Sequence, residues 1–359
     1  MAAGPPGNDE PDEGRVVSKI TSAEVARVAG VSQSAVSRAY TPGASVSPDT
    51  AEKVHEAARR LGYRPNALAR SLITGRSRII ALVVGYFENQ FYPSALELMS
   101  YELKKKGYHL LVFMASNDDA ETERIVADLL DYQVEGLIAA SVAMSVQLAS
   151  RCRAEGIPVI LFNRHQGDDG LTSVTSDNVD GARRIARFLV EGGHRRIAQI
   201  SGWRGSSTGS ERDRGFRFGL AESGVEPIHC VDGKYSREVA SQVARDMFSG
   251  SGGPVPDAVF VGNDHMAFAV MDVIRHELGL RIPEDVSVVG FDDVPIAAWP
   301  SFNLTTMRQP LGRLVEKTVS RMLETIAEPD KPPIQIRIPC EFKIRGTARP
   351  PQAEWTEER

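Results

Sequence analysis

The chain has 359 residues, 42% of them hydrophobic and 25% charged, a balance typical of a globular protein with two or three domains. It contains no run of about 18 apolar residues, which argues against a transmembrane helix. Its three isolated cysteines fit neither a disulfide framework nor a metal-ligand spacing. We therefore expect a protein of the reducing cytoplasm, with no membrane partner.

Charge is distributed unevenly along the chain. The formal net charge is −5, yet residues 15–78 hold 11 Lys and Arg against 4 Asp and Glu. The preceding stretch, MAAGPPGNDEPDEG, is acidic, rich in Gly and Pro and without the apolar core of a signal peptide. We predict a disordered acidic tail over residues 1–17. A basic segment on an acidic body indicates that this segment alone meets a polyanion.

Residues 22–40, SAEVARVAGVSQSAVSRAY, contain two short helical patterns of apolar residues separated by Gly30. Gly30 suits the left-handed backbone of a sharp turn between helices, and Ser32 can cap the second helix. The polar residues on the opposite face of that helix are Gln33, Ser34, Ser37 and Arg38. Such side chains can hydrogen-bond to base edges in the major groove, so the pattern predicts a helix-turn-helix. An Ala/Val-rich helix pair that binds no DNA is the alternative.

A third helix is expected over residues 49–61, because Ser47 and Pro48 form a typical helix start. With it, a helix-turn-helix domain occupies residues 18–62. Residues 66–72 form a helical segment too short to be stable alone in water, and we expect it to fold on DNA. Residues 63–78 are accordingly predicted to be a hinge helix and linker.

From residue 79 onward, apolar strand-like runs alternate with amphipathic helices. The expected strands are 79–84, 110–114, 137–141, 159–162, 197–201, 259–262 and 286–290. The expected helices include 92–106, 120–132, 179–191, 211–223, 237–248 and 265–278. This rhythm predicts parallel sheets covered by helices, and its length favours two α/β subdomains. Ligands of such folds bind at the carboxyl ends of the strands.

Three stretches occur in the order found in one known family: EVARVAGVSQSAVSR, GYRPNALARSLITGRS and GFDDVPIAAWPSFNLTTMRQP. Through them, residues 18 to about 347 resemble the lactose-repressor (LacI/GalR) family of transcription regulators. The resemblance implies a small all-α helix-turn-helix head and an α/β body of two subdomains, like type I periplasmic binding proteins. It further implies a non-enzymatic bacterial repressor that binds a palindromic operator as a homodimer. A small-molecule effector between the subdomains would control DNA affinity, with no cofactor.

The resemblance also assigns DNA contacts to individual residues. Gln33, Ser34 and Arg38 match base-reading positions. Tyr63 and Asn66 match positions that contact the DNA around the hinge. Ala69 and Leu72 match the hinge helix, where Leu72 would wedge between central base pairs in the minor groove and kink the duplex.

Effector contacts are implied in the same way, at the ends of strands and the starts of helices. The matching residues are Phe91, Tyr92, Arg164, Arg214, Tyr235, Asn263, Asp292 and Gln309. Arg214 matches an effector-clamping arginine, and Phe91 and Tyr92 offer aromatic surfaces. Each also has a purely structural interpretation, such as a helix cap for Asp292 or a surface salt bridge for Arg214. The family commonly has Asp, Pro and Asp where this chain has Tyr86, Gln90 and Asn163, which leaves a sugar, a sugar acid or another carboxylate open.

We place the effector-binding and dimerisation domain at residues 79–346. Its first subdomain is expected at about 79–162 plus 293–325, its second at about 163–292 plus 326–346, and a tail at 347–359. The tail lacks leucine heptads, which favours a dimer over a coiled-coil tetramer.

Two other classes of protein are disfavoured. An enzyme lacks support because the chain has no P-loop, no nucleophile-elbow pentapeptide and no metal-ligand spacing. An exported solute-binding protein would have a signal peptide and no basic head. The identity of the effector, its sign of action, and the operator are open at this stage.

Overall fold

The computed structural model describes residues 20–41, 43–64, 76–115, 119–141, 146–167, 170–250 and 253–351. The chain divides into two compact units, Met1–Ser77 and Arg78–Arg359, here called the head and the body. The predicted acidic tail and three hinge positions, Asn66, Ala69 and Leu72, lie outside the described residues. So does most of the predicted C-terminal tail.

The head contains α1 (Ser22–Ala29), α2 (Gln33–Ala39) and α3 (Pro48–Leu61). Local signals fix these bounds. Thr21 and Glu24 form a reciprocal capping box at the start of α1, and Gly30 ends the helix in the left-handed conformation with φ 67°. The Ser32 hydroxyl accepts from the Ala35 N–H at 3.2 Å and caps α2. The predicted helix-turn-helix and third helix are confirmed.

The core of the head is small and fully apolar. It is built from Val25 and Ala26 of α1, Val36 of α2, and Val54 and Ala58 of α3, all buried. Because α2 buries only Ala35 and Val36, its remaining side chains are available at the surface.

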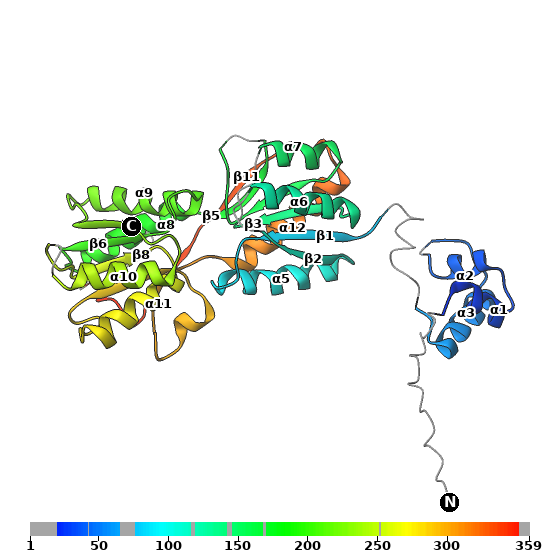
Figure 1. Cartoon of the computed structure of the whole chain (residues 1–359), viewed down its shortest axis with the longest axis horizontal. Coiled ribbons are helices and arrows are strands. Elements are labelled where there is room, and N and C mark those ends of the chain that lie inside the picture. The colour runs from blue at the N-terminus through cyan, green and yellow to red at the C-terminus, as the bar shows by residue number, and fades with distance from the viewer. Residues whose placement is uncertain are drawn as a thin grey trace, which may run out of the picture. The chain divides into compact units, whose positions relative to one another are not determined.

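Within the described residues, the body contains two six-stranded sheets (Figure 1). The first has the order β11-β5-β4-β3-β1-β2 and comprises β1 (Ile79–Val84), β2 (His109–Met114), β3 (Gly136–Ala140), β4 (Val159–Phe162), β5 (Thr172–Ser176) and β11 (Gln335–Ile338). The second has the order β12-β10-β9-β8-β6-β7 and comprises β6 (Ile197–Ser201), β7 (His229–Asp232), β8 (Ala258–Val261), β9 (Ser287–Asp292), β10 (Thr305–Arg308) and β12 (Glu341–Lys343). All pairs are parallel except β10 with β12. The predicted α/β class is confirmed.

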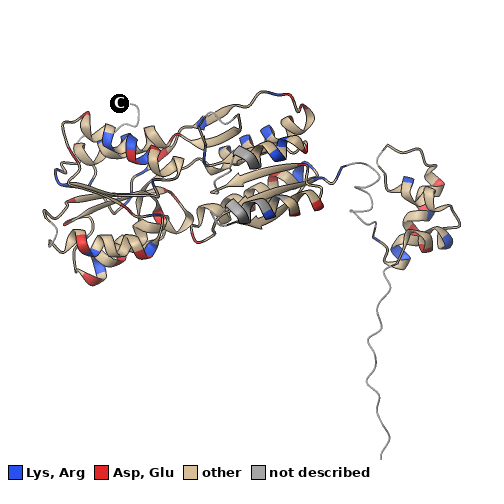
Figure 2. Ribbon diagram, turned by 45° about the horizontal axis from the view of Figure 1, so that its top comes forward, with Lys and Arg blue, Asp and Glu red and all other residues tan. Residues whose placement is uncertain are grey.

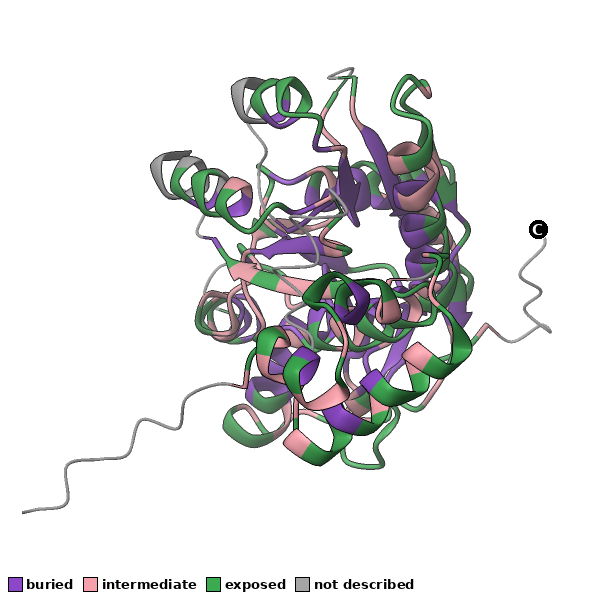
Figure 3. Cartoon of the chain, turned by 90° about the vertical axis from the view of Figure 1, so that its right-hand side faces the viewer, coloured by how far each residue is buried: buried purple, intermediate pink, exposed green. Residues whose placement is uncertain are grey.

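Helices cover both faces of each sheet, so the central strands are buried, whereas the outer helical faces and parts of the edge strands are exposed (Figure 3). The helices of the first subdomain are α5 (Phe91–Lys105), α6 (Asp119–Asp131), α7 (Val146–Ala154) and α12 (Leu311–Ala327). Those of the second are α8 (Asn178–Glu191), α9 (Ser207–Ala221), α10 (Arg237–Phe248) and α11 (Asp264–Asp272), the last extended by the π-turn η1 (Val273–Glu277). A 3-10 turn, η2 (Pro295–Ala298), follows β9.

The chain crosses between the subdomains after β5, after β10 and after β11. These crossings correct the predicted subdomain boundaries. Residues 163–176 stay in the first subdomain because β5 pairs with β4. Residues 293–308 stay in the second because β10 pairs with β9. Residues 335–338 return to the first because β11 pairs with β5, and only β12 closes the second sheet.

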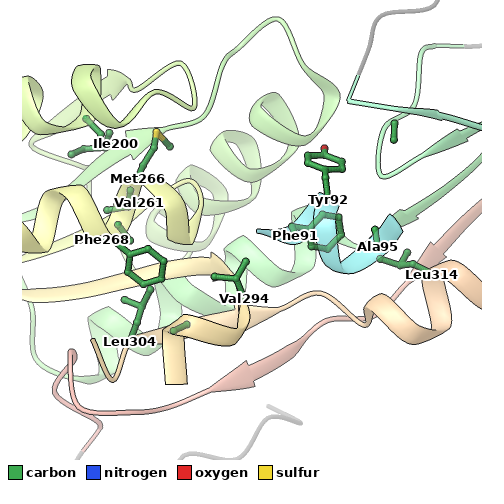
Figure 4. Packing of buried hydrophobic residues seen from close by; sticks show 14 of the residues in the cluster. Phe91, Tyr92, Ala95, Ile200, Val261, Met266, Phe268, Val294, Leu304 and Leu314 are labelled. Atoms are coloured by element: carbon green, nitrogen blue, oxygen red, sulfur yellow. The ribbon is translucent and has the colours of Figure 1, made fainter. Parts of the chain in front are cut away.

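One apolar cluster extends over both subdomains (Figure 4). On the first-subdomain side it includes Phe91, Tyr92 and Leu314, and on the other side Val294 and Leu304. The polar site described next lies between these two parts, at the carboxyl ends of the strands.

Candidate functional site

The four predicted reading residues share the exposed face of α2. Gln33, Ser34, Ser37 and Arg38 are all exposed, whereas Ala35 and Val36 between them are buried. Gln33 Nε2 donates to Ser22 Oγ at 2.9 Å, a bond between α1 and α2 that orients the amide. The arrangement presents hydroxyl, amide and guanidinium groups on one helical face, as base-edge recognition requires.

Tyr63 follows α3 and packs edge-on against Tyr40, with ring centroids 6.2 Å apart. Tyr40 in turn packs against His55 at 5.0 Å. These rings and Arg59 and Arg64 border a shallow pocket of about 370 Å³. Tyr63 is therefore anchored in the head and sits beside two guanidinium groups, a suitable position for contact with a phosphate backbone.

The positive charge of the DNA-binding segment lies mainly outside its three helices. Residues 20–64 hold six Lys and Arg against four Asp and Glu, and both signs occur on the helices (Figure 2). The other five basic residues of the 15–78 segment lie in its two flanks. Most of the net positive charge of residues 15–78 therefore lies in the flanks of the three helices and not on the helices themselves.

In the body, Asp292 is the centre of a buried hydrogen-bond network. It ends β9, adopts a positive φ of 130° and is 4% exposed. Its carboxylate accepts from Asn89 Nδ2 at 3.1 Å and from Gln309 Nε2 at 2.7 Å. Gln309 Oε1 accepts from Ser176 Oγ at 2.8 Å. Because Asn89 follows β1 and Ser176 ends β5, both in the first sheet, the network connects the two subdomains directly.

Arg212 of α9 is the arginine of this network. Its Nη2 lies 3.2 Å from Asp292 Oδ1, its Nε donates to Asn178 Oδ1 at 2.9 Å, and its Nη1 donates to the Gly262 carbonyl at 2.7 Å. The guanidinium also lies 3.7 Å from the ring centroid of Phe291. All these contacts hold it in one orientation.

The prediction of Arg214 as the clamping arginine is therefore wrong in register. Arg214 lies two residues further along α9 and is exposed, since two residues turn a helix by about 200°. The buried face of α9 carries Arg212, Gly215 and Gly219. A Cβ at Gly215 would meet the Val179 backbone at 2.2 Å, which shows how closely α9 packs on α8. The spacing of these residues in the sequence could have identified Arg212.

Asn263 is buried at the start of α11, where its Oδ1 accepts from the Met266 N–H at 3.0 Å. Its side chain thus caps α11. The next residue, Asp264, accepts from Thr306 Oγ1 at 2.6 Å and from the Val294 N–H at 2.9 Å. Burial, reinforced by the nearby Asp292 charge, raises the pKa of Asp264 to about 8. Asp264 is therefore mostly neutral at pH 7.

Aromatic rings flank the network. Phe91 is buried and stacks on Phe162 at 6.2 Å, so its ring belongs to the core of the first subdomain. Tyr92 packs edge-on against Tyr86 at 5.5 Å. Burial raises the pKa of both tyrosines, which keeps their hydroxyls neutral. From the second subdomain, the Tyr235 hydroxyl bonds to Thr208 Oγ1 at 3.2 Å.

Arg164 follows β4 and is 8% exposed. Its guanidinium lies 5.8 Å from the ring centroid of Trp203, which belongs to the second subdomain. Its Nε has no hydrogen-bond partner, and neither has the buried Oδ1 of the adjacent Asn163. Asn163 adopts a positive φ of 56°, a strained conformation of the kind found at binding sites.

A second connection between the subdomains is centred on Glu211 of α9, which sequence reasoning missed. Its carboxylate lies 2.9 Å from His165 Nε2 and 3.6 Å from Arg337 of β11, both in the first subdomain. Asn178 Nδ2 donates to it at 3.0 Å. Adjacent residues of α9, Glu211 and Arg212, thus serve both connections.

The described residues contain no group of three His, Cys, Asp or Glu side chains placed to hold a metal ion. No helix in the described ranges is long and apolar enough to cross a bilayer. The polar network and the rings around it are suited to binding a hydroxylated molecule of modest size.

Comparison with known proteins identifies both units. Residues 21–66 match the model of "Bacterial regulatory proteins, lacI family", and residues 186–348 match that of a "Periplasmic binding protein-like domain". The transcriptional regulator CelR of Thermobifida fusca is 31% identical over 332 residues, covering 89% of this chain and 96% of CelR. The repressor PurR of Photorhabdus laumondii is 31% identical over 308 residues, covering 84% and 89% of the two chains.

Solved structures of related regulators also resemble this chain. A lac repressor dimer bound to operator and the anti-inducer ONPF superposes with a TM-score of 0.82 at 27% identity, covering 92% of this chain and 99% of that chain. A CelR–cellobiose complex superposes with a TM-score of 0.69 at 28% identity, covering 92% and 100%.

Proposed function

The chain belongs to the lacI family of bacterial regulatory proteins, which are DNA-binding transcription regulators, and on this premise we propose that it is a repressor controlled by a small molecule bound at Asp292. One observation carries the proposal. The Asp292 network joins side chains of both subdomains, so a ligand that engages it changes how the subdomains are held together.

The DNA-binding part of the proposal rests on α2. Its exposed polar face supplies direct contacts to bases, while the basic flanks supply salt-dependent affinity for phosphates. A solved relative, the lac repressor, is described as a dimer bound to its operator. We propose the same arrangement for this chain, with one head on each half of a palindrome about one helical turn apart.

A surface of the first subdomain supports the dimer. The edge strand β2 exposes Val112 and Met114, and helix α5 beside it exposes Leu98 and Tyr101, with Tyr101 59% exposed. An unprotected edge strand with apolar side chains favours association with another chain. We propose that a second copy covers this surface.

The effector part rests on the chemistry of the polar site. Asp292 and Arg212 together offer both acceptors and donors, and such pairs hold vicinal hydroxyl groups well. Tyr86, Tyr92 and Tyr235 offer flat surfaces for the apolar face of a ring. CelR is described in complex with cellobiose. For this chain we propose a sugar or a sugar derivative.

Binding of the effector would shift an equilibrium between two arrangements of the subdomains. A typical coupling free energy of about 1–3 kcal/mol changes operator affinity by roughly 5- to 150-fold. Direct contacts between the subdomains, at Asn89–Asp292 and His165–Glu211, are the ones that differential binding would alter.

The test is selection of DNA from a pool of random duplexes by the purified protein, followed by sequencing of the retained DNA. We expect enrichment of a palindrome of about 16–20 base pairs. The variant R38A is expected to lose the enrichment, whereas R214A, altered at an exposed residue of the body, keeps it. Retention of DNA with no enriched sequence would contradict the proposal.

A further inference from the structure

Charges buried around the polar site are almost all paired within the protein. Arg212 faces Asp292 at 3.2 Å. Asp293 lies within 2.6 Å of both Arg308 and Arg345. These groups contribute no unpaired charge, because each carboxylate has at least one guanidinium against it.

Two further carboxyl groups are also accounted for. Glu211 lies against Arg337 and His165. Asp264 is mostly neutral at pH 7, because burial raises its pKa to about 8. These four buried carboxyl groups of the second subdomain, Glu211, Asp264, Asp292 and Asp293, are therefore each either paired or mostly neutral.

Arg164 is the exception. It is more than nine-tenths buried, and no carboxylate among the described residues lies within salt-bridge distance of it. Its Nε has no acceptor. Its guanidinium lies 5.8 Å from the centroid of the Trp203 ring, a weak cation–π contact that compensates only part of the desolvation. A buried cation in this position calls for an anion from outside the protein.

The surroundings of Arg164 place that anion in the effector site. Its positive charge acts on the hydroxyls of Tyr86 and Tyr92, opposing the rise in pKa that burial causes, so it lies near both rings. The unpartnered Asn163 Oδ1 beside it can accept from a hydroxyl group. An anionic group and a hydroxyl group are thus required next to each other.

Building on the proposed function, we propose that the effector is a sugar acid, whose carboxylate pairs with Arg164 while its hydroxyl groups bind the Asp292 network. One negative charge matches the one buried cation, Arg164, that has no carboxylate within salt-bridge distance among the described residues. A phosphate ester carries nearly two charges and would repel Asp292, and a neutral sugar would leave Arg164 unpaired. The flat face of the sugar ring packs against the surrounding aromatic rings.

The first test is thermal unfolding with matched probes at equal ionic strength: glucuronate against glucose, galacturonate against galactose, and gluconate against sorbitol. At least one acid is expected to raise Tm by roughly 3 °C or more when it is in tenfold excess over its Kd. Its neutral partner is expected to bind at least tenfold more weakly. A neutral sugar that matches its acid, or a panel without an active acid, overturns the proposal.

The second test needs no ligand. The variant R164M keeps an unbranched apolar stem and removes the charged guanidinium, and we expect its unliganded Tm to equal or exceed that of the wild type. The matched variant R212M removes a charge that is paired with Asp292, and its Tm is expected to fall. A fall of similar size in R164M would show that the protein itself already compensates Arg164, which overturns the proposal.

Selectivity is then checked in variants. R164M is expected to lose the preference for the acid, whereas R214Q, altered on the exposed face of α9, keeps it. None of these measurements involves DNA. If only neutral sugars bind, the sugar-acid proposal is overturned and the proposed repressor function is unaffected. If the protein fails to select an operator from random DNA, the proposed repressor function is overturned and the sugar-acid proposal is unaffected.

Discussion

Replacement of Asp264 by asparagine is expected to remove a pH dependence from the stability of the body. Asp264 is fully buried at the start of α11, and its pKa is raised from 3.8 to about 8, mainly by burial. The amide of asparagine can make the same contacts. Its oxygen accepts from the Val294 N–H, and its NH₂ group donates to Thr306 Oγ1.

The direction of this pH dependence follows from the number of protons that the native and unfolded states bind. Between pH 4 and pH 8 the native protein keeps a proton on Asp264 that the unfolded chain has lost, so the free energy of unfolding falls as pH rises. Buried His194 makes the free energy of unfolding rise with pH, because burial lowers its pKa to about 4. This contribution is confined to pH values below 6.5. Between pH 6.5 and pH 8, titration of Asp264 lowers the free energy of unfolding of the wild type by about 2 kcal/mol.

Differential scanning calorimetry at pH 6.5, 7.0, 7.5 and 8.0 measures the effect. For a body of this size the loss corresponds to a fall in Tm of roughly 3–8 °C in the wild type, which D264N should not show. The control is D285N. Asp285 has a pKa of about 2 because it bonds to Arg281, so its titration is complete well below this range. The reasoning would be refuted if Tm fell with pH equally in D264N and in the wild type.

Three other substitutions are expected to affect the effector site, the core of the head and the DNA-reading helix independently of one another. Arg212→Ala should abolish the effector response of operator binding in gel-shift titrations and lower Tm, while Arg214→Ala leaves both unchanged. Val54→Ala, in the core of the head, should destabilise that unit by about 2 kcal/mol and leave the calorimetric transition of the body in place. Arg38→Ala should weaken binding to the selected palindrome by about 1–3 kcal/mol and affect random duplexes much less, as competition assays would reveal.

The head could be predicted almost completely from the sequence, because its determinants are local. Thr21, Gly30 and Ser47 fix helix ends within a few residues of themselves. The central strands were equally clear. The run Ile79–Val84 is apolar throughout, as burial on both faces requires, and the observed strand has the predicted bounds.

The subdomain boundaries were mispredicted because they depend on pairing between distant residues. Strand β5 reads TSVTS, with neither an apolar run nor simple alternation, and it is recognisable only through its neighbours β4 and β11. Arg212 was missed for a related reason. The predicted helix began at residue 211, but α9 begins at Ser207, and the extra turn reveals which face is buried.

The last two strands have a consequence for synthesis of the chain. β11 and β12 lie within residues 335–343, yet each closes one edge of a different sheet. Neither subdomain can be completed on the ribosome until residues 335–343 have emerged, although five strands of the first sheet lie within residues 79–176. A nascent or truncated chain that stops before β11 exposes two further sheet edges, at β5 and β10, in addition to those at β2 and β7. Both subdomains therefore reach their final form together, once this short segment has been made.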